Sequence, residues 1–434
     1  MQYRNVPFAI VLLASVLPWV AAAANSKMVT YAPDALAILA YIWLIVRHPL
    51  KAGGIHFNFA MLFLFAGVHV LFGVASGRGV GSGGLVSLLV LAFIFNKLME
   101  QESSPRWANA IARQIGIVYI IHVIFILGEL IFRLAGYTDI LVAIAGQVPD
   151  QIPEVKKYKT YNSAMFLNYL GVENISGMNS LLLGSQSASQ LVLLAAFYFF
   201  PWYKGRHLMQ DGLSHGKWFL LSIALFPFVA SMTAMVILVV LLFFLIYFLP
   251  NSGLNKPILR IATPLLLLIF GAEILSVVAF RISKAAHVDI YMNAFMASPN
   301  AFLELSLLDQ LMGFGSNLRN ADVAAADFGF GMLLYQVGIL LLGFILASFA
   351  LLIYSVRINI SRHAAAELPW SQWTTIAAIN IVCAIGWAVS LIHYTPAVEL
   401  GGRHIFAMHL AVCLIALKKM RVGGLSLTSV VVAR

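Results

Sequence analysis

Long apolar runs separated by short polar segments make up most of the chain. Twelve of these runs are long enough for a helix to cross the roughly 30 Å hydrocarbon core of a membrane, and they lie at about 7–24, 33–47, 56–75, 83–98, 116–134, 181–201, 216–231, 232–250, 258–280, 328–354, 372–394 and 401–417. The stretch from 216 to 250 is too long for one helix, so we divide it between Pro227 and Thr233. The pattern predicts an all-α polytopic membrane protein that forms one transmembrane domain over residues 1–434.

Two long polar segments interrupt this pattern, at about 135–180 and 281–327. Most of the 27 Lys and Arg residues fall in segments that share one side of the membrane if the N-terminus is cytoplasmic. Since short cytoplasmic loops are enriched in Lys and Arg, both termini are predicted to be cytoplasmic and both long segments to be outer loops with short helices. Residues 1–25 also have the pattern of a cleavable signal peptide, whose removal would leave eleven spans in the same orientation.

Composition supports the membrane interpretation. Apolar residues make up 61% of the chain and charged residues 10%, with a mean hydropathy of +0.91, whereas about a quarter of the residues in a soluble domain are charged. The net charge of +10 is explained by the cytoplasmic Lys and Arg, so it does not point to nucleic acid. Cys383 and Cys413 both lie in apolar runs, which favours buried thiols over a disulfide or a metal pair. The sequence has no P-loop and no dinucleotide-binding motif, so any chemistry is expected to use an energised substrate that is already in the membrane.

The second outer loop holds most of the candidate chemistry. Ser298 and Pro299, followed by an apolar run to Met312 and then Gly313, predict a short helix with serine as its N-cap and glycine as its stop. Gly313 and Gly315 allow the backbone to turn sharply or to lie close to a ligand. Charged side chains of this loop are candidate phosphate-binding cations or general bases: Arg281, His287, Arg319, Asp322 and Asp327. A solvated connector with ordinary turn glycines is the alternative.

The first outer loop carries a group of cations among aromatic residues. Its members are Lys156, Lys157, Tyr158, Lys159 and Tyr161. Ammonium groups can meet a phosphate and tyrosine rings can stack on sugar faces, so the group suits a ligand that contains both. A lysine patch on anionic lipid headgroups explains the same pattern equally well. Arg133, which precedes this loop, lies one helical turn after Glu129, so a structural ion pair is at least as good an interpretation there as a catalytic acid at Glu129.

The last outer connection is short but polar. Gly401 and Gly402 give the backbone freedom next to Arg403, which favours a binding role for Arg403; His404 lies beside it at the predicted outer surface. An arginine at a helix end also often simply extends its charge to the interface. Ionisable residues within predicted spans usually face a cavity or a partner; they are His69, His122, Glu129, Glu273, His393 and His409.

Four segments of the chain share features with one family of bacterial envelope enzymes. Leu308–Gly315 is an apolar stretch that ends in a Gly-x-Gly turn within a large external loop, and Asp327–Gly329 leads from polar residues into a span that contains glycine. Residues 231–248 are similar to a Ser-Arg-Thr-Ala type of helix start, and residues 168–185 are similar to the segment after the first external loop. In these features the chain resembles the O-antigen polymerase and ligase superfamily.

Two departures from the family pattern bear on the activity. Met232 stands where many members have arginine, and no histidine lies between Gly315 and the next span, where the ligases place a catalytic one. Asp327 occupies that region instead, which favours a polymerase over a ligase.

The resemblance implies a metal-independent and cofactor-independent glycosyltransferase of the bacterial inner membrane. It would polymerise repeat units carried on undecaprenyl pyrophosphate, on the periplasmic side, into O-antigen or exopolysaccharide. Its partners would be the lipid-linked donor and acceptor, membrane lipid and a regulator of chain length, and not nucleic acid. The expected pyrophosphate-binding residues are Arg133, Arg281, Arg319 and Arg403. The expected bases are His287, Asp322 and Asp327, and the expected glycan-binding residues are Lys156, Lys157, Lys159, Tyr158, Tyr161 and His404.

Two alternatives remain open. An O-antigen ligase would transfer finished polymer to the lipid A core, and a flippase or other transporter would move lipid-linked oligosaccharide across the membrane. The polar residues concentrate in two outward loops instead of spreading through the helices, which favours the enzyme.

Overall fold

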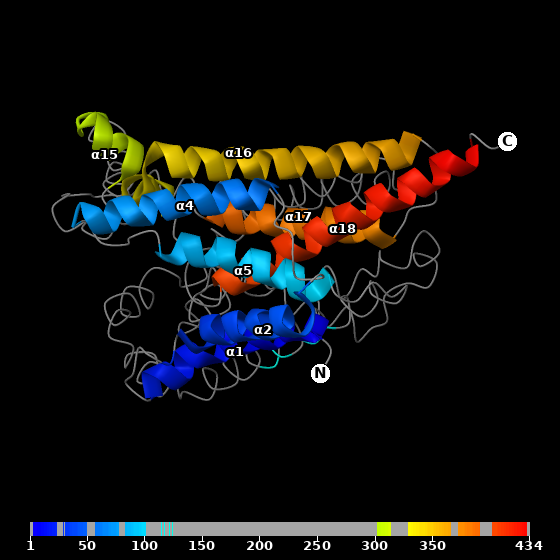
Figure 1. Ribbon diagram of the computed structural model, residues 1–434, viewed down its shortest axis with the longest axis horizontal. Coiled ribbons are helices and arrows are strands. Elements are labelled where there is room, and N and C mark those ends of the chain that lie inside the picture. The colour runs from blue at the N-terminus through cyan, green and yellow to red at the C-terminus, as the bar shows by residue number, and fades with distance from the viewer. Residues whose placement is uncertain are drawn as a thin grey trace, which may run out of the picture.

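The computed structural model describes part of the chain, and all of its described elements are helical (Figure 1). The described residues are 3–23, 29, 31–49, 57–77, 83–100, 114, 117, 121, 124, 302–313, 329–365, 372–390 and 402–431. After a short 3-10 helix, η1 (Tyr3–Asn5), the helices are α1 (Val6–Ala23), α2 (Ala32–Arg47), α4 (Phe57–Ala75), α5 (Gly83–Glu100), α15 (Leu307–Met312), α16 (Gly329–Ala365), α17 (Gln372–Ser390) and α18 (Gly402–Val431). No strand occurs in these residues, so the prediction of an all-α fold is confirmed for them.

The first residues of the long helices lie close to the predicted first residues of the apolar runs. α1, α2, α4, α5, α16, α17 and α18 each start within one residue of a predicted span. Within the described ranges, the segment Leu333–Arg362 is long and apolar enough to cross a membrane, and Phe59–Ala75 and Ile376–Ile385 are shorter apolar helices. Apart from Ile117, Ile121 and Ile124, the predicted spans between 116 and 280 lie outside the described residues, so the number of twelve stays a prediction.

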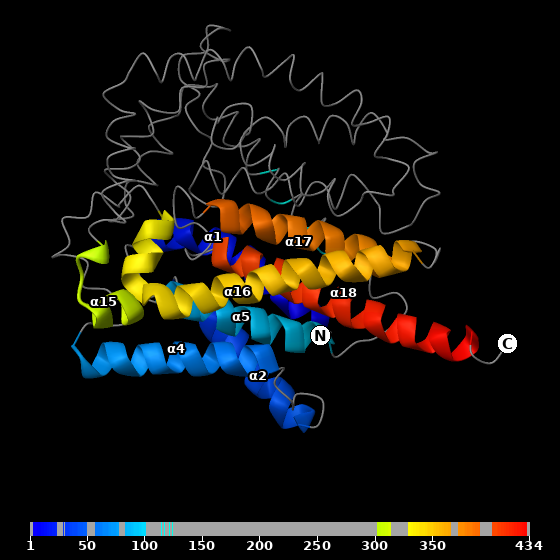
Figure 2. The ribbon, with the colours of Figure 1, turned by 90° about the horizontal axis from the view of Figure 1, so that it is seen from above.

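Helix α18 lies at the centre of the described bundle. It packs against α17, α5, α1 and α16, and the long helices run roughly alongside one another in both views (Figures 1 and 2). Small residues, which allow helices to approach closely, are fully buried in both α17 and α18; they include Ala377, Ala384, Ala407, Ala411 and Ala416. The core is therefore formed by helix-to-helix packing along α18.

The outward faces of α2, α4 and α16 are apolar. Leu39, Trp43, Leu71, Leu351 and Tyr354 are each more than half exposed. A soluble monomer seldom exposes contiguous apolar surface of this kind, whereas lipid tails solvate it without cost. The exposure therefore suits helices that border a bilayer.

The loop helix α15 differs in part from its prediction. Its N-cap is Ser306 and not Ser298: the Ser306 hydroxyl accepts a hydrogen bond from the Asp309 backbone N–H at 3.2 Å, while the Asp309 carboxylate meets the same hydroxyl at 2.6 Å. This reciprocal cap starts a new helix, because a turn at Glu304 and Leu305 separates α15 from the helical residues before it. The predicted stop at Gly313 is confirmed, with φ of 74° and a hydrogen bond from its N–H to the Asp309 carbonyl at 2.8 Å.

Helix α16 is broken inside. Gly338 has φ 71° and ψ 173°, so two helical segments meet there at a kink. Such a conformation is almost confined to glycine, because a Cβ atom would clash with the backbone. The break lies against the end of α15, and the packing between them places the loop helix on the bundle.

Candidate functional site

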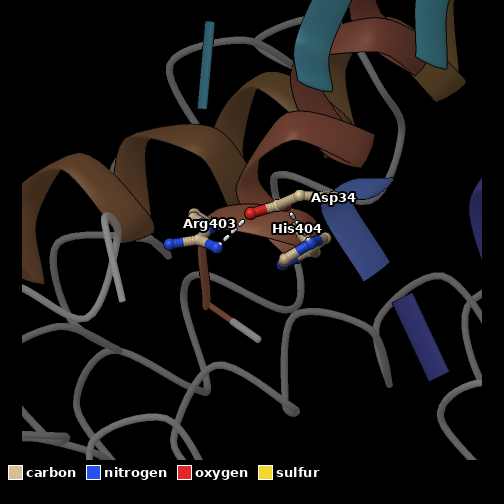
Figure 3. Close-up of polar contacts among 3 residues, drawn as sticks. All are labelled: Asp34, Arg403 and His404. Atoms are coloured by element: carbon tan, nitrogen blue, oxygen red, sulfur yellow. Dashed lines mark hydrogen bonds and ion pairs between the residues drawn. The ribbon is translucent and has the colours of Figure 1, made fainter. Parts of the chain in front are cut away.

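Three polar side chains from the two ends of the sequence converge at the start of α18. Asp34 lies in the first turn of α2, and Arg403 and His404 lie in the first turn of α18 (Figure 3). The Arg403 Nη2 atom donates to Asp34 Oδ2, and His404 Nε2 lies 2.9 Å from Asp34 Oδ1. The two oxygens of one carboxylate thus face two different basic side chains.

Local sequence explains why the three residues meet. Pro33 is the second residue of α2, and its ring suits the first helical turn. Asp34 follows it in the same turn, where a carboxylate is favoured by the N-terminal end of the helix dipole. Helix α18 begins at Gly402, so Arg403 and His404 occupy its first turn. In the predicted topology both helix starts face the outer side of the membrane.

A second ion pair lies at the other end of the same bundle. Lys418 of α18 donates to Glu100 at the end of α5. Lys418 follows Arg403 by fifteen residues, or about 22 Å along a helix at 1.5 Å per residue. The side chains of α18 between the two pairs are almost all buried and apolar, with His409 as the buried polar exception. The predicted topology puts Glu100 and Lys418 on the cytoplasmic side, so each ion pair joins residues assigned to the same side.

Burial gives the outer cluster its electrostatic character. The side chain of His404 is fully buried, while those of Asp34 and Arg403 are 21% and 13% exposed. Charges in such an environment interact more strongly than in bulk water. Arg403 Nε is buried and makes no hydrogen bond, so the orientation of the guanidinium is set by the Nη2 contact with Asp34. A guanidinium oriented in this way suits an anion with two or more oxygens.

The structure brings together two of the predicted site residues, Arg403 and His404. Gly313 lies elsewhere, at the crossing of α15 and α16, where its neighbours are the backbone atoms of Gln336 and Gly338. The other predicted residues lie outside the described part of the chain: Arg133, Arg281, Arg319, His287, Asp322, Asp327, Lys156, Lys157, Lys159, Tyr158, Tyr161 and Gly315.

Asp34 was not predicted as a site residue. The signal that identifies it is an acidic residue in the first turn of a predicted span, where an uncompensated carboxylate is costly and implies a partner. Its partner Arg403 is 369 positions away in the chain, and no spacing pattern in the sequence predicts that contact.

Two further polar groups are buried between α17 and α18. Asn380 Oδ1 lies 2.8 Å from His409 Nδ1, and the Asn380 amide donates to the Ile376 carbonyl at 2.9 Å. Because the amide oxygen can only accept, His409 carries its proton on Nδ1 when it is neutral. Cys383 and Cys413 are buried and form no disulfide, as predicted. Within the described residues no group of three or more His, Cys, Asp or Glu side chains is placed to hold a metal ion.

Comparison with known proteins identifies no relative of this chain. No family model, no curated protein and no solved structure matches the chain. Its function is therefore argued from its own residues.

Proposed function

We propose that the chain is a glycosyltransferase of a bacterial inner membrane that joins lipid-linked oligosaccharide repeats into a polysaccharide on the periplasmic side. The observation that carries the proposal is the cluster of Arg403, His404 and Asp34 at the helix ends assigned to the outer face. A basic group that a carboxylate orients at a helix end assigned to the outer face suits a pyrophosphate whose polyprenyl tail remains in the bilayer.

The reaction needs stabilisation of the leaving group more than a strong base. The bond between the anomeric carbon of the donor and its pyrophosphate oxygen breaks, and the acceptor hydroxyl oxygen forms the new bond to that carbon. The pyrophosphate leaves with the electron pair, while the hydroxyl proton passes to a base. Arg403 would neutralise the charge that develops on the pyrophosphate, and an oriented cation does so without reorganising during the reaction.

Asp34 and His404 have positioning roles in this proposal. Asp34 orients the guanidinium of Arg403 by a hydrogen bond, and His404 Nε2 lies 2.9 Å from the second oxygen of Asp34. His404 is fully buried, so it acts through Asp34 and not by touching the glycan directly. Arg133, Arg281 and Arg319 are proposed as further pyrophosphate ligands.

The base and the glycan contacts are assigned to the two outer loops. His287, Asp322 and Asp327 are the proposed bases. The Lys and Tyr group of the first loop (Lys156, Lys157, Tyr158, Lys159 and Tyr161) is proposed to hold the glycan. The donor is the growing chain on undecaprenyl pyrophosphate, the acceptor is a second lipid-linked repeat unit, and a chain-length regulator is a proposed protein partner.

One structural feature favours transport as the second candidate function. Broken helices with exposed backbone groups line the substrate sites of many transporters, and α16 is broken at Gly338. A flippase for the same lipid-linked sugars would have the same hydrophobic envelope.

Deletion of the gene separates these functions by the glycan that accumulates. Loss of long chains, with single repeats still attached to the lipid A core, supports the polymerase. Long chains that accumulate unattached would identify a ligase, and repeat units trapped on the cytoplasmic side would identify a flippase. Either of the last two outcomes overturns the proposal.

A further inference from the structure

The loop helix α15 is fixed to the break in α16 by a close contact between the two backbones. A Cβ atom added to Gly313 would lie 2.6 Å from the Gly338 nitrogen, and a Cβ atom added to Gly338 would lie 2.3 Å from the Leu311 carbonyl oxygen. Both glycines have positive φ angles, and neither has a side chain that would hold the two backbones apart. The C-terminal end of α15 therefore lies at the same level along α16 as Gly338.

The depth of Gly338 in a membrane follows from the length of α16 beyond it. The segment Leu333–Arg362 is long and apolar enough to cross a membrane, and α16 is kinked at Gly338 inside that segment (Figure 2). The next charged residue after Gly338 is Arg357. The helix between these two residues is about 28 Å long at 1.5 Å per residue, close to the roughly 30 Å thickness of the hydrocarbon core. With Arg357 at the cytoplasmic boundary of the core, Gly338 and the end of α15 lie at the outer boundary.

At this depth α15 has an exposed apolar side. Leu307 and Leu308 of α15, and Leu303 in the turn before it, are each more than half exposed. Successive residues of a helix are about 100° apart, so the next two residues, Asp309 and Gln310, point to the other side of α15. The loop helix is thus amphipathic, with its leucines free to meet an apolar environment.

The apolar surface continues from α15 onto α16. Ile339 and Leu340, which directly follow the break, are each 45% exposed, and Leu351 further along the helix is more than half exposed. Since α15 packs on α16 at this break, its leucines adjoin a helix face that suits lipid.

Polar groups of the loop helix are bonded within the segment itself. The Gln310 side-chain amide donates to the carbonyls of Leu303 and Leu305, at 2.8 and 2.9 Å. The Ser306 hydroxyl meets the Asp309 carboxylate at 2.6 Å. A backbone carbonyl without a partner is costly where water is excluded, so these bonds suit a segment that borders lipid.

The exposed side chains favour lipid over a protein partner. All three are leucines, which are under-represented among the residues that dominate the binding energy of protein interfaces, whereas tryptophan, tyrosine and arginine are enriched there. Acyl chains need only an apolar surface, and α15 presents one at the depth where acyl chains begin.

We propose that α15 is an interfacial helix that inserts Leu303, Leu307 and Leu308 among the lipids of the outer leaflet, at the boundary between headgroups and acyl chains. The sequence predicts residues 281–327 to be an outer loop, and the proposal puts this part of the loop into the bilayer instead of into the water above it. The inference rests on α16 crossing a membrane and not on the proposed glycosyl transfer.

Spin labels on α15 of the full-length protein in lipid bilayers test the proposal. A nitroxide is attached to Leu307→Cys and, in a second protein, to Leu308→Cys, both exposed positions outside the core. Power saturation measures the collisions of each label with oxygen, which concentrates in lipid, and with a water-soluble nickel chelate. Both labels are expected to collide more often with oxygen and to lie about 5–10 Å into the boundary between headgroups and acyl chains.

Control labels define lipid and water in the same protein. Leu351→Cys lies on the exposed face of α16 and should report lipid, whereas His48→Cys lies at the exposed end of α2 and should report water. The wild-type protein, whose Cys383 and Cys413 are buried, gives the background of the labelling.

Three results would overturn the proposal. Labels on α15 that meet nickel as often as the His48→Cys label would place the helix in water. Labels on α15 that are shielded from both reagents would place it under protein. A Leu351→Cys label that does not report lipid would show that α16 does not cross the bilayer. A protein without glycosyltransferase activity would still give the expected depth, so the failure of that activity is distinguishable from the failure of this inference.

Discussion

Gly338→Ala tests whether the kink in α16 and the docking of α15 are one structural unit. The new methyl group would lie 2.3 Å from the Leu311 carbonyl oxygen, far inside van der Waals contact, and alanine would have to adopt φ 71° and ψ 173°. Backbone strain of this kind costs about 1–3 kcal/mol, and overpacking adds a further 1–3 kcal/mol or so. We therefore expect the free energy of unfolding to fall by about 2–6 kcal/mol.

A matched control lies five residues further along the same helix. A Cβ atom added to Gly343 meets nothing within 4 Å, and alanine favours helix over glycine by about 1 kcal/mol. Gly343→Ala is therefore expected to leave the protein as stable as the wild type or slightly more stable.

Equilibrium unfolding of the purified protein in mixed detergent micelles measures both variants. Hydrogen exchange at Leu307–Met312 shows in addition whether α15 has left α16 in the folded Gly338→Ala protein. If the two alanine variants unfold with the same free energy and α15 keeps its protection in both, the close crossing does not exist and the reasoning is refuted.

Three further predictions follow from the polar contacts of α18. Asp34→Asn removes the charge that orients Arg403, so glycan polymerisation should fall about tenfold or more while the amount of protein in the membrane stays normal. Polymerisation is measured on the envelope of a deletion strain complemented with the variant gene. An unchanged chain length would show that Asp34 is not part of the site. Asn380→Leu leaves the Nδ1 proton of His409 without its acceptor and should lower the free energy of unfolding by about 1–3 kcal/mol; no loss in the same micelle assay would contradict the assigned pair. Lys418→Ala removes an ion pair whose lysine is 65% exposed, so the free energy of unfolding should change by no more than about 1 kcal/mol. A larger decrease would show that this pair is more than a surface contact.

The apolar pattern predicted the helices well because helix length and hydrophobicity are local properties of the chain. α1, α4 and α5 follow their predicted runs closely. The stop of α15 at Gly313 was also predictable, since glycine there has the positive φ of a helix end. Its start was not, because Ser306 and Asp309 form a closer cap than Ser298 offers and the competition between caps depends on the turn at Glu304.

The features that the sequence did not predict depend on contacts between distant segments of the chain. Arg403 was predicted from its position beside two glycines and His404 from its place in the same outer connection, whereas their common partner Asp34 lies at the opposite end of the sequence. Gly338 was recognised only as a glycine within a span. Its role as the break in α16 depends on the close approach of the Leu311 and Gly313 backbone, which belongs to another segment of the chain. Such constraints arise from the packing of segments that are distant in the sequence, so they produce no periodic pattern of apolar residues.

Reconstitution with the natural substrate tests the proposed activity most directly. Lipid-linked repeat units isolated from the deletion strain are supplied to the purified protein in proteoliposomes, and released undecaprenyl pyrophosphate and glycan length are measured together. The wild-type protein should release one pyrophosphate for each repeat added. Arg403→Ala should reduce that rate about a hundredfold or more, and Lys418→Ala should match the wild type. Repeat units that cross the bilayer without any elongation, or an Arg403→Ala protein that elongates them at the wild-type rate, would contradict the account.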